Sequence, residues 1–554
     1  MLKKRRFLVL SLVIMVSFSV GFITHVPDNY FEISKNLDIF GKLYREINSL
    51  YVDDTDPSEL MRTGIDAMLN SLDPYTNYIG EEEIEDFRFM STGKYGGIGA
   101  LIGKRKGNIV VLEPYDGYPA QKAGLKAGDQ ILQIEDTKIG SDKEVSDVRD
   151  LLRGEEGTPV KLTIQRLGEE EPMILSLERD QVKVDNVPYS GMVNDHIGYI
   201  ALTGFTQDAG KEVKKALEKL KKEHSSLSGL ILDLRGNPGG RLDEAINVAN
   251  VFITQKEKIV ETRGRQEESR RALYANRPAT DDMTPLAVLV NSRSASASEI
   301  VAGSIQDLDR GIVVGNRSFG KGLVQNIRPL SYNSQLKVTT AKYYTPSGRC
   351  IQAINYADRN EDGSVARIPD SLKNSFTTRN GRTVYDGGGI EPDFDVKKDK
   401  LSTIALELNR QGLIFDFATQ FVAENKTIAS AREFKISDKV YRDFMAYVKK
   451  QDFDFETRAE KQLEKLVETV EKESYGEKMK DDLANLESKL ESLKDKDMLK
   501  HKGEIAELLK DEIVRRYYFK AGAIEASLSG DEDIVKAMEI LESQVKYKET
   551  LAIK

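Results

Sequence analysis

The chain has 554 residues, a net charge of -9 and a single cysteine, Cys350. This length is enough for several domains, each with its own hydrophobic core. The acidic balance argues against nucleic-acid binding, because the sequence shows no basic stripe and no base-stacking aromatic pattern. One cysteine cannot form an internal disulfide, so the fold must be stable without one.

The N-terminus carries four basic residues between Met1 and Arg6, followed by an apolar run from Phe7 to about Thr24. A basic stretch before an apolar run is typical of an export segment. Residues 1–27 are therefore expected to be a signal peptide or a membrane anchor, and both remain open because the run is just long enough to span a bilayer. The remainder is expected outside the cytoplasm, either periplasmic or attached to the inner membrane.

Residues 28–92 are expected to form a helical N-terminal domain, with a turn at 73–77. Short strands and glycine turns then occupy 93–182, and their spacing resembles a bacterial PDZ domain. A PDZ domain binds an extended C-terminus along a sheet edge and holds the carboxylate in a glycine-containing loop. Gly97, Ile98 and Gly99 are the candidate peptide-binding residues, with the helix around 145–152 as the other wall. The alternative is that these glycines are ordinary hairpin residues.

Residues 183–399 repeat the order strand, turn and helix, with apolar strands at 229–235, 286–290 and 311–315. This order predicts an α/β core in which helices cover a sheet. The polar, glycine-rich stretch from 355 to 389 is expected to be a long surface loop. Residues 400–554 are expected to form a helical, highly charged C-terminal domain, for which roles in dimerisation or as a lid are both open.

Ser296 and Lys321 are the candidate catalytic pair. A serine hydroxyl needs a proton acceptor within hydrogen-bond reach to act as a nucleophile. None of the four histidines lies in a glycine- or serine-rich turn that looks like a catalytic loop, whereas Lys321 lies between two glycines that an aromatic residue precedes. A lysine acts as a base when burial and a nearby positive potential lower its pKa. The simpler alternatives are a capping box formed by Ser296 with Glu299 and a solvated loop lysine.

The start of the helix after Ser296 is a candidate oxyanion hole, because unpaired backbone N–H groups and the helix dipole create positive potential there. The N–H of Ala297 is one expected donor, and an N–H of Gly239 or Gly240 is the second. No His-Glu-x-x-His motif occurs, so a metalloprotease is disfavoured and no metal or other cofactor is expected.

Five further motifs carry a family resemblance. They are Asp233-Leu-Arg-Gly-Asn-Pro-Gly-Gly240, Ser294-Ala-Ser-Ala-Ser-Glu-Ile300, Ser318-Phe-Gly-Lys-Gly-Leu-Val-Gln325, Tyr344-Thr-Pro-Ser-Gly-Arg349 and Gly388-Gly-Ile-Glu-Pro-Asp393. Over residues 28–399 the chain resembles the carboxyl-terminal processing peptidases, also called tail-specific proteases.

This resemblance implies a multidomain α/β protein with a core of the crotonase-like ββα kind. It also implies Ser296 as nucleophile, Lys321 as base, Gln325 as the residue that orients the lysine, and Asp307 in a supporting role. The implied reaction is cleavage of a captured C-terminal tail through an acyl-enzyme. The chain departs from the family pattern at 291–293, before the serine run, and in its long C-terminal extension.

Two competing interpretations remain. One is a PDZ scaffold or chaperone that keeps the fold without catalysis, and the other is a histidine-based hydrolase that uses His196 or His224. The expected partners are protein or peptide substrates with exposed C-terminal tails, and homo-oligomerisation and membrane attachment are open.

Overall fold

The computed structural model describes residues 29–224, 226–359, 364–397, 401–494 and 496–553. The chain separates into two compact units, residues 1–78 and 79–554. The expected signal peptide or anchor at 1–27 lies outside the described residues. Within the described ranges, no helix has both the length and the apolar character that a membrane crossing needs.

The first unit contains the helices α2 (Asn29–Leu50) and α3 (Pro57–Asn70). Asp56 caps α3 by accepting hydrogen bonds from the backbone N–H groups of Ser58 and Glu59, and a proline occupies the first turn. After α3, the Asp73 carboxylate accepts from the N–H groups of residues 75 and 76, which forms the predicted turn. The helical prediction for this region is therefore confirmed up to the turn.

The predicted PDZ segment follows α4 (Ile84–Thr92) and folds around a six-stranded antiparallel sheet. Inward-facing residues alternate along its strands, as expected of a sheet with one buried face; Val160, Leu162 and Ile164 are examples. Two short helices, α5 (Pro119–Lys122) and α6 (Val145–Leu152), accompany the sheet. Its main path runs β3 (Ala100–Arg105), β4 (Asn108–Pro114), β5 (Gln130–Ile134), β7 (Pro159–Gln165) and β8 (Met173–Glu178), with β6 (Thr137–Lys138) on β5. A separate strand pair joins β2 (Lys94–Gly97) to β9 (Asp180–Lys183).

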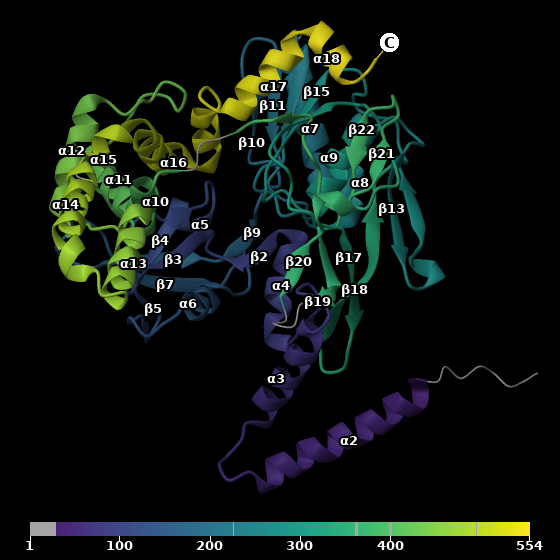
Figure 1. Ribbon diagram of the computed structural model, residues 1–554, viewed down its shortest axis with the longest axis horizontal. Helices are drawn as coiled ribbons and strands as arrows, with labels where there is room; N and C mark the ends of the chain where they lie inside the picture. Colours follow the sequence, from purple (N-terminus) through teal and green to yellow (C-terminus); the bar gives the residue numbers. More distant parts are fainter. Residues whose placement is uncertain (1–28, 225, 360–363, 398–400, 495, 554) are drawn as a thin grey trace, which may run out of the picture. The chain divides into compact units, whose positions relative to one another are not determined.

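The α/β core is built on a second six-stranded sheet (Figure 1). Its order is β10 (Tyr189–Met192), β11 (Ile197–Ala201), β12 (Gly229–Asp233), β15 (Leu286–Val290), β16 (Ile312–Gly315) and β23 (Phe394–Asp395). Only β10 is antiparallel to its neighbour. Every residue of β11, β12, β15 and β16 is buried, which explains why these strands appear in the sequence as continuous apolar runs.

Helices cover both faces of this core sheet. On one face lie α7 (Ala209–Glu223), α8 (Leu242–Phe252) and α9 (Ala297–Asp307), within the largest hydrophobic cluster. On the other face lie α17 (Glu532–Glu542) and α18 (Gln544–Thr550), which come from the end of the chain. The predicted α/β multidomain fold class is confirmed, and the last two helices belong to the packing of the core sheet.

A second antiparallel sheet includes β13 (Lys258–Gly264), β14 (Arg271–Tyr274), β17 (Leu323–Pro329) and β18 (Gln335–Tyr344). The stretch at 355–389 is not the predicted long loop. It contains the strand pairs β19 (Ile354–Arg359) with β20 (Val365–Arg367) and β21 (Ser375–Thr377) with β22 (Thr383–Tyr385). The prediction was wrong because strand pairing uses backbone groups, which polar residues supply as well as apolar ones do.

The C-terminal helices before α17 form their own hydrophobic cluster, which includes Phe417, Tyr441 and Phe444. These helices are α10 (Thr403–Arg410), α11 (Leu413–Glu424), α12 (Asp438–Lys449), α13 (Arg458–Lys472), α14 (Gly476–Lys494), α15 (Asp497–Lys500) and α16 (Lys502–Ser527). The helical prediction for this part of the chain is confirmed.

Candidate active site

Ser296 occupies the sharp turn between β15 and α9. Its backbone has φ 55° and ψ -111°, outside the extended conformation of an ordinary N-cap. A non-glycine residue in such a conformation costs of order 1–3 kcal/mol and persists only where the surroundings enforce it. The flanking serines provide that enforcement, because Ser294 donates to the Leu234 carbonyl at 2.8 Å and Ser298 donates to the Asn237 carbonyl at 2.9 Å. The outer serines hold the turn, and the middle serine lies at its tip.

The glycine turn after β12 packs directly on this serine turn. A Cβ atom added to Gly239 would lie 2.7 Å from the Ala295 carbonyl oxygen and 2.9 Å from both Ala297 N and Ser296 Cβ. Glycine is therefore required there, and its φ of 98° is a second reason. The fully buried Asn237 accepts the Gly239 N–H at 2.9 Å. Gly240 packs against the Phe205 carbonyl, where an added Cβ would lie at 2.5 Å.

Glu299 connects two segments, the turn at 294–298 (the serine turn) and the loop at 318–322 (the lysine loop). Its carboxylate, fully buried, accepts four hydrogen bonds. One oxygen, Oε2, accepts from the N–H groups of Ser296 and Lys321, each at 2.8 Å. The other, Oε1, accepts from the Ser318 hydroxyl at 2.5 Å and the Gly320 N–H at 2.7 Å. Because Ser296 N and Lys321 N bind the same oxygen atom, they cannot be further apart than twice that bond length.

Burial raises the pKa of Glu299, and the hydrogen bonds from Ser318 and from the backbone of Lys321, Ser296 and Gly320 oppose that shift. The four donors named above are three backbone N–H groups and one hydroxyl. The sequence pattern assigned Glu299 only to a capping box, which explains its bond to Ser296 N but not its bonds to the lysine loop.

Tyr343, on β18, is a further residue at the serine that the sequence pattern did not reveal. Burial raises the pKa of Tyr343 to about 12, and a hydrogen bond with the Ser296 side chain opposes the shift. Its backbone N–H donates to the Gly322 carbonyl at 2.8 Å, which ties β18 to the lysine loop. The phenol thus belongs to the surroundings of the Ser296 hydroxyl.

Gln325 lies on β17, four residues after Lys321. Its side-chain amide donates to the Thr339 hydroxyl on the neighbouring strand at 3.2 Å. Half-buried, it occupies the strand that continues directly from the lysine loop. Its predicted role in orienting Lys321 stays a prediction.

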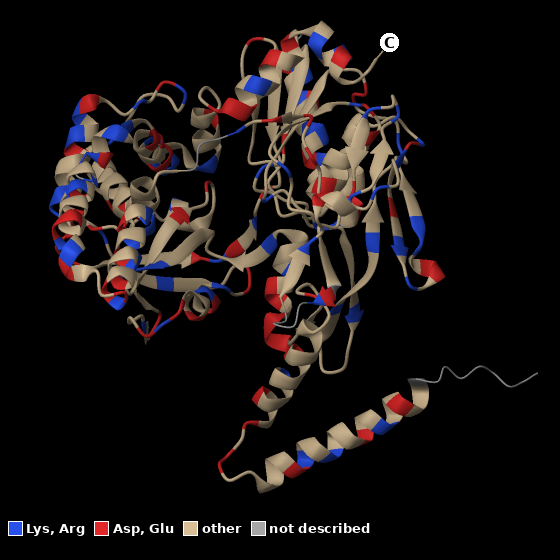
Figure 2. Cartoon of the chain, in the orientation of Figure 1, with Lys and Arg blue, Asp and Glu red and all other residues tan. Residues whose placement is uncertain are grey.

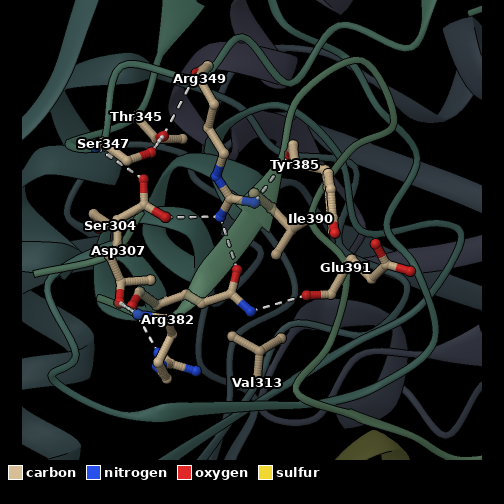
Figure 3. Close-up of polar contacts among 12 residues, drawn as sticks. Ser304, Asp307, Val313, Thr345, Ser347, Arg349, Arg382, Tyr385, Ile390 and Glu391 are labelled. Carbon is tan, nitrogen blue, oxygen red and sulfur yellow. Dashed lines mark hydrogen bonds and ion pairs between the residues drawn. The ribbon is translucent and has the colours of Figure 1, made fainter. Parts of the chain in front are cut away.

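Asp307 lies at the opposite end of α9 from Ser296, roughly 16 Å along the helix axis. Figure 3 shows its carboxylate facing Arg349 and the loop at Ser347. Asp307 pairs with Arg349 at 2.8 Å, and both side chains are almost completely buried. The same carboxylate accepts the Ser347 N–H at 3.0 Å. A supporting role in catalysis would therefore have to act through the position of α9.

The predicted peptide-binding loop lies beside β3, an edge strand of the PDZ sheet, and α6 contacts this strand. The Ile98 carbonyl accepts the Ala120 N–H and the Gly99 carbonyl accepts the Tyr115 N–H, each at 2.8 Å. Gly99 has φ 74°, and a Cβ added there would lie 2.4 Å from Tyr118. Gly97 ends β2, immediately before this loop.

The two histidines of the competing hydrolase interpretation lie at the opposite ends of the core strands from Ser296. His196 precedes β11 and His224 follows α7 just before β12, so both are near the amino ends of the parallel strands. Ser296 follows the carboxyl end of β15. The described residues also contain no cluster of three potential metal ligands.

Comparisons with known proteins show the family and the domains of the chain. Three family models match: "Peptidase family S41" at 196–358, "PDZ domain" at 110–166 and "Probable PDZ-protease, C-terminal helical domain" at 404–541. The carboxy-terminal-processing protease of Bartonella bacilliformis is 39% identical over 356 residues, which is 64% of this chain and 81% of that protein. The carboxy-terminal processing protease CtpA of Bacillus subtilis is 31% identical over 79% of this chain and 90% of its own length. A solved photosystem II D1 C-terminal processing protease is 28% identical, covers 66% of this chain and 93% of its own, and has a TM-score of 0.35.

The match of the α/β core to a peptidase family, next to a PDZ domain and a helical domain of PDZ-proteases, identifies a serine-type peptidase. The chain belongs to the carboxy-terminal processing proteases of peptidase family S41.

Proposed function

We propose that this protease attacks peptide bonds with the Ser296 hydroxyl while the uncharged amine of Lys321 accepts the hydroxyl proton. The observation that carries the proposal is the Glu299 carboxylate, because one of its oxygens binds the backbone N–H groups of both residues. The strained backbone of Ser296 and the close approach of Gly239 support the same assignment.

In this mechanism the Ser296 oxygen forms a bond to the scissile carbonyl carbon, and its proton moves to Lys321. The Ala297 N–H and an N–H of Gly239 or Gly240 stabilise the resulting oxyanion. The Gly239 N–H donates to the Asn237 side chain in this structure. To bind the oxyanion, this N–H would have to give up its hydrogen bond to Asn237. The lysine proton then passes to the leaving amine, and water hydrolyses the acyl-enzyme ester.

The PDZ domain would bind the exposed C-terminal tail of the protein substrate by pairing it with the edge of β3. Gly97, Ile98 and Gly99 would hold the terminal carboxylate through backbone N–H groups. Gln325 would orient Lys321, and Asp307 would support the site through α9. The basic and apolar N-terminal segment favours an exported protein that acts outside the cytoplasm, with the segment either cleaved or retained as a membrane anchor.

The test uses the full chain and an unfolded peptide with a free C-terminus, with fragments identified by mass spectrometry. Ser296→Ala and Lys321→Ala should each abolish cleavage while thermal unfolding stays close to that of the unchanged protein. Lys211→Ala, on the exposed side of α7, is the matched control and should cleave normally. Full activity of Lys321→Ala would refute the Ser/Lys pair, and absence of cleavage by the unchanged chain would favour the scaffold interpretation.

A further inference from the structure

The antiparallel helices α13 and α14 form a hairpin that shares little of the core of the C-terminal domain. The two helices pack on each other, as Figure 1 shows. None of their described apolar residues belongs to the hydrophobic clusters of the molecule. The apolar seam between the two helices is covered in part, since Leu463 and Val470 are buried while Val467 and Leu483 are half-buried and Ala484 is exposed.

A groove of about 1150 Å³ runs between the two helices. Its apolar lining comes from both of them and from the segment that precedes α13. These residues are Phe455, Leu463, Val467, Val470, Leu483 and Ala484. Within α13, Leu463, Val467 and Val470 follow the spacing of one helical face, so the groove has a continuous apolar floor.

The rim of the groove is strongly acidic. Acidic and basic residues both occur along the C-terminal helices (Figure 2). Between residues 456 and 494, however, seven of the eleven acidic residues line the groove, against two of the eight basic ones. One of these two bases, Lys494, already pairs with Asp454 and Glu460. The acidic residues are thus concentrated on the groove side, and most of the lysines lie elsewhere on the hairpin.

We propose that this groove is a docking site for a cationic amphipathic helix of a partner protein. The apolar face of such a helix would cover the floor, and its lysines or arginines would meet the acidic rim. With 15 residues in α13 and 19 in α14, the hairpin offers a partner helix roughly 20–30 Å of length. The proposal adds an interaction surface to the protease and does not depend on the identity of its catalytic residues.

The test uses the full chain with Ser296→Ala, so that the probe is not cleaved. The probe is a synthetic peptide of about 18 residues, five helical turns, with leucines at i, i+3, i+4 and i+7 and lysines elsewhere. Its C-terminus is amidated, which removes the carboxylate that a PDZ domain binds. A scrambled peptide of the same composition serves as the control, and binding is measured by calorimetry at about 0.15 M salt, where long-range charge effects are screened.

The double variant Glu464→Lys with Glu487→Lys should weaken binding at least tenfold, because both carboxylates line the groove. The matched control, Glu473→Lys with Asp481→Lys, changes two exposed acids of the same hairpin outside the groove and should weaken binding less than twofold. Helical content, from circular dichroism, should be the same in both variants.

Equal weakening by the two double variants, equal binding of the scrambled peptide, or no binding of the probe would each overturn the proposal. Sedimentation of the protein alone provides a further check. An oligomer that the groove variant dissociates and the control variant leaves intact would identify a second copy of the chain as the occupant, which also overturns it.

Discussion

A buried carboxylate lies at each end of α9, and the two carboxylates bind different kinds of partner. At the N-terminal end, Glu299 accepts hydrogen bonds from the Ser318 hydroxyl and from backbone N–H groups of the serine turn and the lysine loop. At the C-terminal end, Asp307 faces the guanidinium of Arg349 at 2.8 Å. Removing one partner of such a buried ion pair is strongly destabilising, because the other charge is then left buried without compensation. A buried carboxylate that binds the backbone of both the serine turn and the lysine loop couples the positions of these two segments to one ionisable group.

Arg349→Ala should give the largest effect, a loss of about 3–5 kcal/mol in the free energy of unfolding, because it leaves Asp307 buried without its cation. Denaturant unfolding measures this loss. The kcat of the folded fraction should change little if the C-terminal end of α9 serves the fold alone. A large fall in kcat at unchanged stability would instead place Asp307 in the chemistry.

A double change sharpens this test. Asp307→Leu combined with Arg349→Met removes both charges and should be less destabilising than Arg349→Ala. If the double variant is as unstable as the single one, packing of the long arginine side chain, and not the ion pair, is what stabilises this end of the helix.

Glu299→Gln should lower kcat about 10- to 100-fold, about 1.4–2.7 kcal/mol in activation free energy. A neutral amide cannot accept all four hydrogen bonds, so the serine turn and the lysine loop lose their common anchor. The matched control is Glu244→Gln, a mostly buried carboxylate that accepts the Gly210 N–H at 2.9 Å. It should reduce stability without lowering the kcat of the folded enzyme.

The pH dependence separates the two roles of Glu299. Because its folded pKa is raised, its contribution to stability is greatest below the unfolded pKa and is lost as pH rises through the folded pKa. Activity should change in the opposite direction, since only the ionised carboxylate accepts all four bonds. As pH falls through this range, kcat should fall while the unfolding free energy of the unchanged protein, relative to Glu299→Gln, rises. Parallel changes in both would contradict the coupling.

Tyr343→Phe should give the smallest effect, a two- to tenfold fall in kcat with little change in KM, because it removes one hydroxyl from the surroundings of Ser296. Tyr441→Phe, which removes a buried phenol hydroxyl bonded to the Met498 carbonyl in the C-terminal helices, is the matched control. Equal effects of the two changes on kcat would show that the Tyr343 hydroxyl acts through stability alone.

Local sequence was sufficient for the helices and strands that carry the site. The apolar strands at β12, β15 and β16 and the helix after Ser296 follow from short-range patterns, because a buried parallel strand needs a continuous apolar run. The strands β19 to β22 are polar and carry no such apolar run. The sequence pattern therefore missed them, because their pairing depends on backbone groups.

The sequence by itself determined the protease family, the order of the domains and the serine turn, since these depend on residue types at fixed spacing. Only the tertiary structure decided which groups surround the serine. The groups come from four segments, which are the glycine turn after β12, the start of α9, the loop at 318–322 and β18. Hydrogen bonds of 2.8–2.9 Å join Asn237 to Gly239, Glu299 to Lys321 and Tyr343 to Gly322. Such contacts require the sheet register and the packing of α9 to be fixed first, and no local pattern contains that information.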